Sequence, residues 1–475
     1  MSPFQGEGQG FKSPPPLKMS KKIIFIFLIA FLIRLIALNQ SFWQDEATTA
    51  KVVQQYSYSE IITKFSPQDF HPPLYYLFMK FWTNFFGYSE IALRMPSVLF
   101  SLATGYIVYL IAGIWGAIFF LYNPLIVYYS QEARMYMMAT FFLTVGIYYF
   151  LKSQKLEVKS QKYLPTGQAG NSKLKSLFLM NLFCTVAFFS FYGSAFLIVT
   201  AILYSLIKKD YKVFILNTLY FILVVLIISP LLYQQLINAK TSFPNVANWN
   251  LVLGKANLKN LLLIPIKFSI GRIGFYPKWL YYLIAGGWTA FIISQILNLK
   301  SQIYISNRKS INLFLFLFIF PLILGFVVSF WTPLLQYFRF LYLIPIMCIL
   351  LAKNKNTMFQ YVLVAGFVTF SLVYLLFSQF HREDWKSLVK SLPDDKPVYM
   401  ILASSDPLKY YNHNLTIKEL KNSRINELEN EIIVIPFTAG VYGFDYKTVL
   451  KKKNFSLTSK KSFRELELEN WKRIN

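Results

Sequence analysis

The sequence consists largely of long apolar runs that are separated by short polar segments. A helix that crosses a bilayer needs about 20 predominantly apolar residues, and many of the runs approach this length. The pattern therefore predicts about eleven transmembrane helices. The expected spans are residues 23–38, 91–111, 113–129, 134–151, 176–190, 194–207, 213–231, 279–297, 312–331, 337–352 and 358–378.

Composition supports the same class of protein, a polytopic α-helical membrane protein. Hydrophobic residues make up 55% of the chain, aromatic residues 19% and charged residues only 15%. The formal net charge of +26 does not indicate nucleic-acid binding, because the Lys and Arg residues are spread over short loops instead of forming one basic face. Cys184 and Cys348 both lie inside apolar runs, so we expect core residues and no disulfide framework.

Basic residues between the runs predict the orientation in the membrane. Residues 1–22 form a polar tail with lysines at its end, which predicts a cytoplasmic N-terminus and an uncleaved first span. The same orientation makes every cytoplasmic loop basic, and an odd number of spans places the C-terminus outside. We expect a multi-pass protein of the plasma (inner) membrane with a transmembrane domain over residues 23–378. Its external segments would be residues 39–90, the turn at 130–134, the loop 232–278 and the tail 379–475.

The tail after the last expected span has a pattern of its own. The stretch His381-Arg382-Glu383-Asp384-Trp385 opens a helical pattern, and its acids suit a helix N-terminus. Residues Val398–Leu402 and Ile432–Phe437 are typical of buried strands and alternate with polar helical segments. We therefore predict that residues 379–475 form a small external α/β module, which either binds an acceptor or caps the membrane core.

Charged side chains gather at the expected external ends of the spans. The loop after the first span contains Phe42–Ala47, with the adjacent carboxylates Asp45 and Glu46. Snorkelling to the interface would explain any single arginine there, but several arginines and acids at one face favour a polar cavity. Because guanidinium groups match phosphate oxygens, we expect a site for an anionic phosphate whose lipid tail stays in the bilayer. The other charged residues of this group are Arg34, Arg94, Glu132, Arg134 and Arg339.

A second polar segment precedes an apolar aromatic stretch. His71-Pro72-Pro73-Leu74-Tyr75-Tyr76 begins this stretch, and its prolines predict the start of an amphipathic helix along the interface. Tyr75 and Tyr76 are either pocket residues or members of an interfacial aromatic belt. His71 is either a substrate contact or a hydrogen-bonding loop anchor.

A third segment, Tyr129–Tyr136, lies at the external junction of the third and fourth expected spans. Ser130 and Glu132 suit the start of a helix. Arg134 does not, because a positive charge is unfavourable at a helix N-terminus. This misfit predicts a ligand or an acidic partner for Arg134.

These motifs resemble those of the membrane-embedded C-type (GT-C) glycosyltransferases, especially the protein O-mannosyltransferases and the aminoarabinose lipid A transferases. Residues 20–150 contain nearly all of the resemblance. Two departures are the direct meeting of the second and third spans at Ala112-Gly113 and a Phe at position 340, where Tyr is usual. The matching pieces are Asp45-Glu46, His71-Pro72-Pro73-Leu74-Tyr75-Tyr76, Arg94-Met95-Pro96-Ser97, Ser130-Gln131-Glu132-Ala133-Arg134-Met135-Tyr136 and, more weakly, Arg339-Phe340-Leu341.

The resemblance implies a GT-C fold and an inverting transfer of a hexosyl or pentosyl group. The sugar would pass from a polyprenyl phosphate to a protein, lipid or glycan acceptor on the external side. Asp45 would be the base on the acceptor hydroxyl, with Glu46 supporting it, and Arg134 and Arg339 would hold the donor phosphate. The candidates for the substrate pocket are His71, Tyr75, Tyr76, Gln131, Glu132 and Tyr136.

The residue types alone, without the resemblance, also favour transfer of a group from a lipid phosphate. Transfer from a lipid phosphate needs a base near the acceptor oxygen and cations that stabilise the departing phosphate. A nucleotide-sugar donor is disfavoured, because the chain has no Asp-x-Asp pair and no Gly-rich phosphate loop after a strand. Whether a divalent metal takes part stays open: Glu46, His71 and Glu132 are candidate ligands, but their spacing selects no coordination geometry.

Two other functions are compatible with the same charged groups. A flippase or transporter for lipid-linked sugars also needs a polar cavity for a phosphate. Transporters usually bind their substrate near the bilayer midplane, whereas the charges here cluster at one face, so the sequence favours an enzyme. A ligase that moves a glycan from a lipid pyrophosphate needs the same base and cations, and the sequence does not separate it from a transferase.

Overall fold

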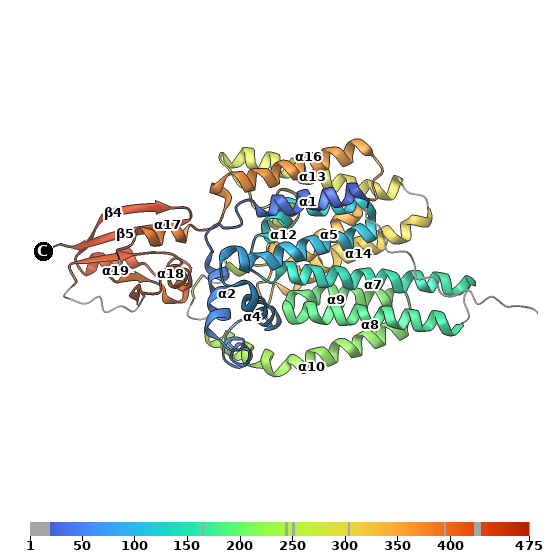
Figure 1. Ribbon diagram of the computed structural model, residues 1–475, viewed down its shortest axis with the longest axis horizontal. Coiled ribbons are helices and arrows are strands. Elements are labelled where there is room, and N and C mark those ends of the chain that lie inside the picture. The colour runs from blue at the N-terminus through green and yellow to red at the C-terminus, as the bar shows by residue number, and fades with distance from the viewer. Residues whose placement is uncertain are drawn as a thin grey trace, which may run out of the picture.

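The computed structural model describes residues 20–163, 166–242, 246–248, 252–302, 305–393, 396–421 and 429–474. A bundle of long helices is joined at one end to a smaller domain that contains a β-sheet (Figure 1). The expected N-terminal tail lies outside the described residues up to residue 19.

The bundle consists of α-helices and short π-helical and 3-10 segments, which carry the label η, joined by loops. In chain order they are α1 (Lys21–Leu35), α2 (Gln44–Gln55), α3 (Tyr58–Glu60), η1 (Ile61–Phe65), α4 (Leu74–Phe86), α5 (Glu90–Leu121), α6 (Pro124–Ser130), α7 (Tyr136–Tyr163), α8 (Thr166–Ser190), η2 (Tyr192–Ser194), α9 (Ala195–Ile207), α10 (Tyr211–Ser242), α12 (Leu258–Ile270), α13 (Lys278–Gln302), α14 (Ile305–Val328), η4 (Tyr337–Leu343), α15 (Ile344–Leu351) and α16 (Thr357–Leu376).

Among the described residues, six helices are long and apolar enough to cross a membrane. Their outward faces are apolar: Leu219, Leu226 and Ile227 of α10 are 62%, 61% and 63% exposed, as expected of side chains that face lipid. The chain is therefore a multi-pass membrane protein, whereas the expected count of about eleven spans is not confirmed. The six candidate spans are Glu90–Leu121, Lys173–Ser190, Tyr211–Ser242, Lys278–Leu299, Lys309–Val328 and Thr357–Leu376.

Helix α5 turns back on itself at Gly113. This residue has φ 74° and ψ −165°, a conformation that is essentially restricted to glycine. Beyond it the chain runs back along α5, because a Cβ atom placed on Gly105 would lie 2.5 Å from the side chain of Leu121. In a straight helix those two residues would be about 24 Å apart. The second and third expected spans therefore meet at Gly113 without an intervening loop.

The C-terminal domain is an α/β module, as its apolar pattern predicts. Strand β1 pairs in parallel with β2 and β3, and β5 pairs antiparallel with both β3 and β4, so the sheet order is β2-β1-β3-β5-β4. Val398 and Met400 pack with Trp385 in one apolar cluster, whereas Tyr399 lies in a second cluster with Trp471. The elements are η5 (Ser378–Phe380), α17 (Trp385–Lys390), β1 (Val398–Met400), η6 (Leu402–Ser404), α18 (Asp406–Tyr411), β2 (Ile417–Glu419), β3 (Glu431–Val434), α19 (Tyr446–Lys452), β4 (Phe455–Phe463) and β5 (Leu466–Arg473).

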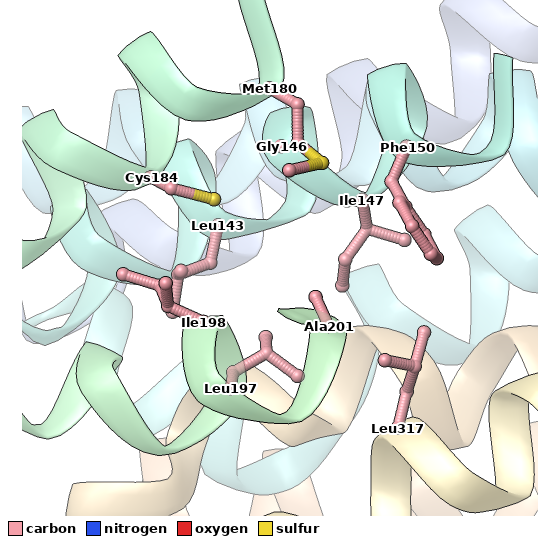
Figure 2. A pocket seen from close by; sticks show the side chains of 10 residues that line it. All are labelled: Leu143, Gly146, Ile147, Phe150, Met180, Cys184, Leu197, Ile198, Ala201 and Leu317. Carbon is pink, nitrogen blue, oxygen red and sulfur yellow. The ribbon is translucent and has the colours of Figure 1, made fainter. Parts of the chain in front are cut away.

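A small pocket lies inside the helical bundle, between α7, α8, α9 and α14 (Figure 2). Its lining is apolar apart from the thiol of Cys184, which lies close to Gly146. Such a lining provides neither a base nor a cation, so this pocket is not a candidate for group-transfer chemistry. The lining residues are Leu143, Gly146, Ile147, Phe150, Met180, Cys184, Leu197, Ile198, Ala201 and Leu317.

Replacing Gly113 tests the turn in α5. Gly113→Ala should destabilise the protein by about 1–3 kcal/mol, because an alanine is strained at this φ and ψ even though its Cβ would meet no atom within 4 Å. Thermal unfolding in detergent measures the change. Gly286→Ala is the matched control: this helical glycine also has open space, so alanine should leave stability unchanged or raise it slightly. Equal melting temperatures for Gly113→Ala and wild type would contradict the strain argument.

Candidate active site

The acidic segment after α1 forms the first turn of a helix. We expected a loop at Phe42–Ala47, but α2 begins at Gln44 and contains both carboxylates in its first turn. Acidic groups are favourable there because the helix N-terminus carries a partial positive charge. The two carboxylates have different surroundings: Glu46 is fully buried, whereas the side chain of Asp45 is 40% exposed.

Glu46 is bound on both oxygens by a fork of two hydrogen bonds from Arg94. The Nε atom of Arg94 lies 2.8 Å from Oε1 and its Nη2 atom lies 2.5 Å from Oε2, while the backbone N–H of Ala133 donates to Oε1 at 2.7 Å. Arg94 also donates to the backbone carbonyls of Leu38 and Gln40 at 2.8 and 2.6 Å. This buried pair therefore holds three segments against α5: helix α2, the chain that follows α1, and residues 129–134 at and after the end of α6, called the 129–134 turn below.

Asp45 faces a second arginine, Arg134, from the 129–134 turn. The Nη2 atom of Arg134 lies 3.5 Å from Oδ2 of Asp45, and its Nη1 atom is 3.4 Å from the Asp45 carbonyl and 3.5 Å from the Tyr76 hydroxyl. These contacts are all long for hydrogen bonds of a guanidinium group. Arg134 is nevertheless almost fully buried, and its Nε atom has no partner among the described residues. The sequence predicted a ligand or an acidic partner for Arg134, and Asp45 is an acidic neighbour at 3.5 Å.

Arg339 approaches the same region from η4. Its guanidinium group donates to the carbonyls of Leu253 and Pro333 at 3.1 and 3.2 Å. The neighbouring Phe338 ring contacts the Tyr136 ring, with centroids 5.4 Å apart. Tyr136 lies within the electrostatic reach of Arg134, Asp45 and Arg339. Tyr136 is therefore near both of the arginines that the family resemblance assigns to the donor phosphate.

Helix α4 brings two tyrosines to the site region, and Tyr76 lies beside Arg134. Tyr75 and Tyr76 are buried, with ring centroids 5.5 Å apart, so they are core residues of the site region instead of members of a lipid-facing belt. The helix expected after the prolines is confirmed over Leu74–Phe86, and it exposes Phe81 and Phe85. The belt interpretation of the two tyrosines was therefore wrong.

His71 is paired with an acid that the sequence analysis missed. Its Nδ1 atom lies 3.2 Å from Oδ1 of Asp69. Burial alone would raise the pKa of Asp69, but the charges of His71 and Arg134 bring this pKa below its usual value. Gln235 of α10 donates to the His71 carbonyl at 3.1 Å and holds the loop in place. The signal for Asp69 was its position two residues before His71 in the same Pro-rich segment.

The remaining residues of the 129–134 turn have different roles. Gln131 donates to the carbonyls of Arg34 and Ile36 at 2.9 and 2.5 Å, so it binds the end of α1. Glu132 is buried and pairs with Arg382, whose Nε and Nη2 atoms both lie 3.1 Å from Oε1. Burial raises the pKa of Glu132, and the Arg382 guanidinium partly offsets this rise. Arg382 belongs to the junction with the C-terminal domain, for which the sequence suggested only helix capping.

Not every arginine of the expected cluster reaches the site. Arg34 is buried against α5, where it donates to Ser101 and to the Leu121 carbonyl at 2.8 Å each. It fixes α1 to both halves of α5 and has no contact with Asp45. The expectation that all of these arginines line one cavity was therefore wrong for Arg34, because a buried guanidinium group can be satisfied by a hydroxyl and carbonyls.

Several buried polar atoms of the segments that carry Asp45, Asp69 and Arg134 have no hydrogen-bond partner among the described residues. In most proteins roughly 90% or more of buried polar groups have a hydrogen-bond partner, so a cluster of exceptions marks a place where a polar ligand or solvent can bind. Within the described part of the chain, no group of three or more His, Cys, Asp and Glu residues is arranged to hold a metal ion. The atoms without a protein partner in this region are Trp43 Nε1, Gln44 Oε1, Asp69 Oδ2, Tyr75 Oη, Tyr129 Oη, Gln131 Oε1, Glu132 Oε2 and Arg134 Nε.

Substituting Arg94 tests its structural role. Arg94→Leu should lower stability by about 3–5 kcal/mol, because it leaves the Glu46 carboxylate buried without its cationic partner. Thermal unfolding in detergent measures the loss, and adding Glu46→Gln should recover part of it by removing the charge. Lys64→Ala, which breaks the exposed pair with Glu60, should have little effect. A small effect of Arg94→Leu would show that the ion pair does not organise this end of the bundle.

Comparisons with known proteins give a fold and no sequence family. No protein-family model and no curated protein matches the sequence. The solved structures of ArnT from Cupriavidus metallidurans, in the apo state and bound to undecaprenyl phosphate, each superpose with a TM-score of 0.53 at 11% identity. The alignments cover 94% of this chain and 97% or 98% of ArnT.

A more distant similarity is to the archaeal oligosaccharyltransferase AglB from Archaeoglobus fulgidus, in complex with an inhibitory peptide and a dolichol-phosphate. Its TM-score is 0.49 at 11% identity, over 92% of this chain and 72% of AglB. The similarity to ArnT extends over nearly the whole of both chains, so the present chain has the fold of ArnT and resembles the GT-C glycosyltransferases.

Proposed function

We propose that this protein is an inverting glycosyltransferase that moves a sugar from a polyprenyl-phosphate donor to a hydroxyl group of a protein, lipid or glycan. One observation is the main support: a half-exposed carboxylate, Asp45, faces a buried and incompletely paired arginine, Arg134. A base and a cation for the phosphate are thus side by side at the end of an apolar bundle. ArnT, which has the same fold, binds undecaprenyl phosphate.

Asp45 is the proposed base. Inversion by a single displacement needs a base within about 3 Å of the acceptor oxygen, and the exposure of the Asp45 side chain lets an acceptor approach it. Glu46 is proposed to support Asp45 by holding the start of α2 in place, because Arg94 binds both oxygens of Glu46. In the proposed reaction the acceptor oxygen forms a bond to the anomeric carbon, Asp45 takes the hydroxyl proton, and the phosphate leaves with the bonding electrons on its lipid.

Arg134 and Arg339 are the proposed ligands of the donor phosphate. A phosphate oxygen would offer Arg134 shorter, charge-assisted hydrogen bonds than its present contacts of 3.4–3.5 Å. The apolar bundle leaves the polyprenyl tail in lipid while the phosphate reaches these cations. The remaining pocket residues proposed around them are His71, Tyr75, Tyr76, Gln131, Glu132 and Tyr136.

The proposed orientation places the site and the C-terminal domain on the external side of the plasma membrane, with the N-terminus in the cytoplasm. The basis is the surplus of Lys and Arg in the alternate loops. The sugar is proposed to be a hexose or a pentose.

The first test is Asp45→Asn, which keeps the shape of the side chain and removes its basicity. Transfer of radiolabelled mannose, glucose or arabinose from polyprenyl phosphate to total membrane acceptors should fall about 100-fold or more, in line with the loss of a general base. Asp210→Asn, in the connection between α9 and α10, is a matched control and should transfer as well as the wild type. Full transfer by Asp45→Asn would exclude Asp45 as the base.

A second test separates the arginines from the base. Arg134→Gln should weaken binding of undecaprenyl phosphate about tenfold or more, because it removes a cation from a poorly solvated phosphate site. Arg134→Lys should lose less, and Arg339→Gln should also weaken binding. Isothermal titration in detergent provides the affinities, with exposed Lys64→Gln as control. Unchanged affinity in both Arg→Gln variants would show that the phosphate binds elsewhere.

A further inference from the structure

The C-terminal domain touches the candidate active site directly. Helix α18 packs against α2, the helix that carries Asp45, and the two lie together where the domains meet (Figure 1). The Tyr411 hydroxyl accepts a hydrogen bond from the backbone N–H of Phe42 at 2.8 Å and lies 3.1 Å from Oε1 of Glu90 on α5. The C-terminal domain therefore contacts both the segment that leads into α2 and helix α5 of the bundle.

Arg382, at the entrance to this domain, joins both signature segments of the site. Its guanidinium carbon lies 3.8 Å from the centroid of the Trp43 ring, a short distance for a cation–π contact. The same group pairs with Glu132 at 3.1 Å. Trp43 directly precedes α2 and lies two residues before Asp45, while Glu132 lies two residues before Arg134. One side chain thus bridges the segment that carries the proposed base and the turn that carries the proposed phosphate ligand.

Asp406, at the start of α18, makes a second contact with α2. Its Oδ2 atom accepts a hydrogen bond from the Thr48 hydroxyl at 2.9 Å, and its Oδ1 atom pairs with Lys51 at 2.9 Å. Thr48 lies less than one helical turn after Asp45. The opposite side of α2 is held by the Glu46–Arg94 pair, so α2 is fixed between α5 and α18.

We propose that the C-terminal domain positions the active site, and that Arg382 is the positioning residue through which it sets the distance between Asp45 and Arg134. A planar guanidinium group can stack on Trp43 and pair with Glu132 at the same time, whereas lysine cannot do both. The domain then does more than cover the bundle: the transferase geometry depends on it. This inference rests on the proposed function for its catalytic consequence, but the contacts themselves do not.

The experiment uses the full-length protein in lipid nanodiscs with Arg382→Gln and Arg382→Lys. Arg382→Gln should lower kcat for sugar transfer at least about tenfold with less than about a threefold change in donor KM, since both catalytic groups remain present but are misplaced. Arg382→Lys should recover only part of kcat. The control is Glu467→Gln, which breaks an exposed pair with Lys460 in the same domain and should change nothing.

A second measurement separates positioning from simple loss of stability and does not need activity. In Arg382→Gln, hydrogen exchange should become faster for the backbone amides of residues 44–55 and 131–135, and stay unchanged in β4 and β5. Adding Glu132→Gln should restore the melting temperature, because it removes a buried carboxylate that has lost its cationic partner.

The outcomes test the proposed transferase function and the positioning role of Arg382 separately. If wild type transfers no sugar but exchange still quickens in both segments, the proposed function fails and the positioning stands. If wild type is active while Arg382→Gln keeps its kcat and its exchange pattern, the positioning is wrong. It is also wrong if the double variant regains kcat along with its melting temperature, since stability alone would then explain the loss.

Discussion

The buried ion pair between Glu46 and Arg94 is the contact on which this end of the molecule depends. It joins α2 to α5 through two charge-assisted hydrogen bonds, while Arg94 also binds the chain that leaves α1 and Glu46 accepts from the 129–134 turn. Two charges buried this deeply are stable only when every polar atom is paired. The pair therefore demands one arrangement of these segments, and that arrangement places Asp45 opposite Arg134.

Arg94 and Arg134 differ in how completely their guanidinium groups are paired, and this difference suits Arg94 to holding the fold and Arg134 to binding a ligand. Both are buried, but Arg94 has short contacts with an acid and with carbonyls, whereas Arg134 has only long contacts and an Nε atom without a partner among the described residues. A guanidinium group that stays buried and incompletely paired is suited to an anionic ligand. In the proposed reaction, the half-exposed carboxylate of Asp45 beside it would be the base that glycosyl transfer to a hydroxyl needs.

Local patterns predicted much of this structure. Long apolar runs indicated the membrane helices, and short apolar runs in the C-terminal tail indicated β1 and β3. The misfit of Arg134 indicated a ligand or an acidic partner. Long-range contacts were beyond such patterns. The use of Arg34 in helix packing, and the pairing of Arg382 with Glu132 across 250 positions, depend on which helices become neighbours. The sequence indicated a short connection at Gly113. That α5 consists of two antiparallel halves became clear only from its backbone geometry.

The most direct test of the central claim follows both parts of the donor at once. Purified protein is placed in sealed lipid vesicles with polyprenyl phosphate that carries a carbon-14 sugar and a phosphorus-32 phosphate, together with membrane acceptors. A transferase moves the sugar label to the acceptor and leaves the phosphate label on the lipid. We predict this separation of the labels. If both labels cross the vesicle membrane together on an intact donor, the protein is a transporter and the account of Asp45 as a base is wrong.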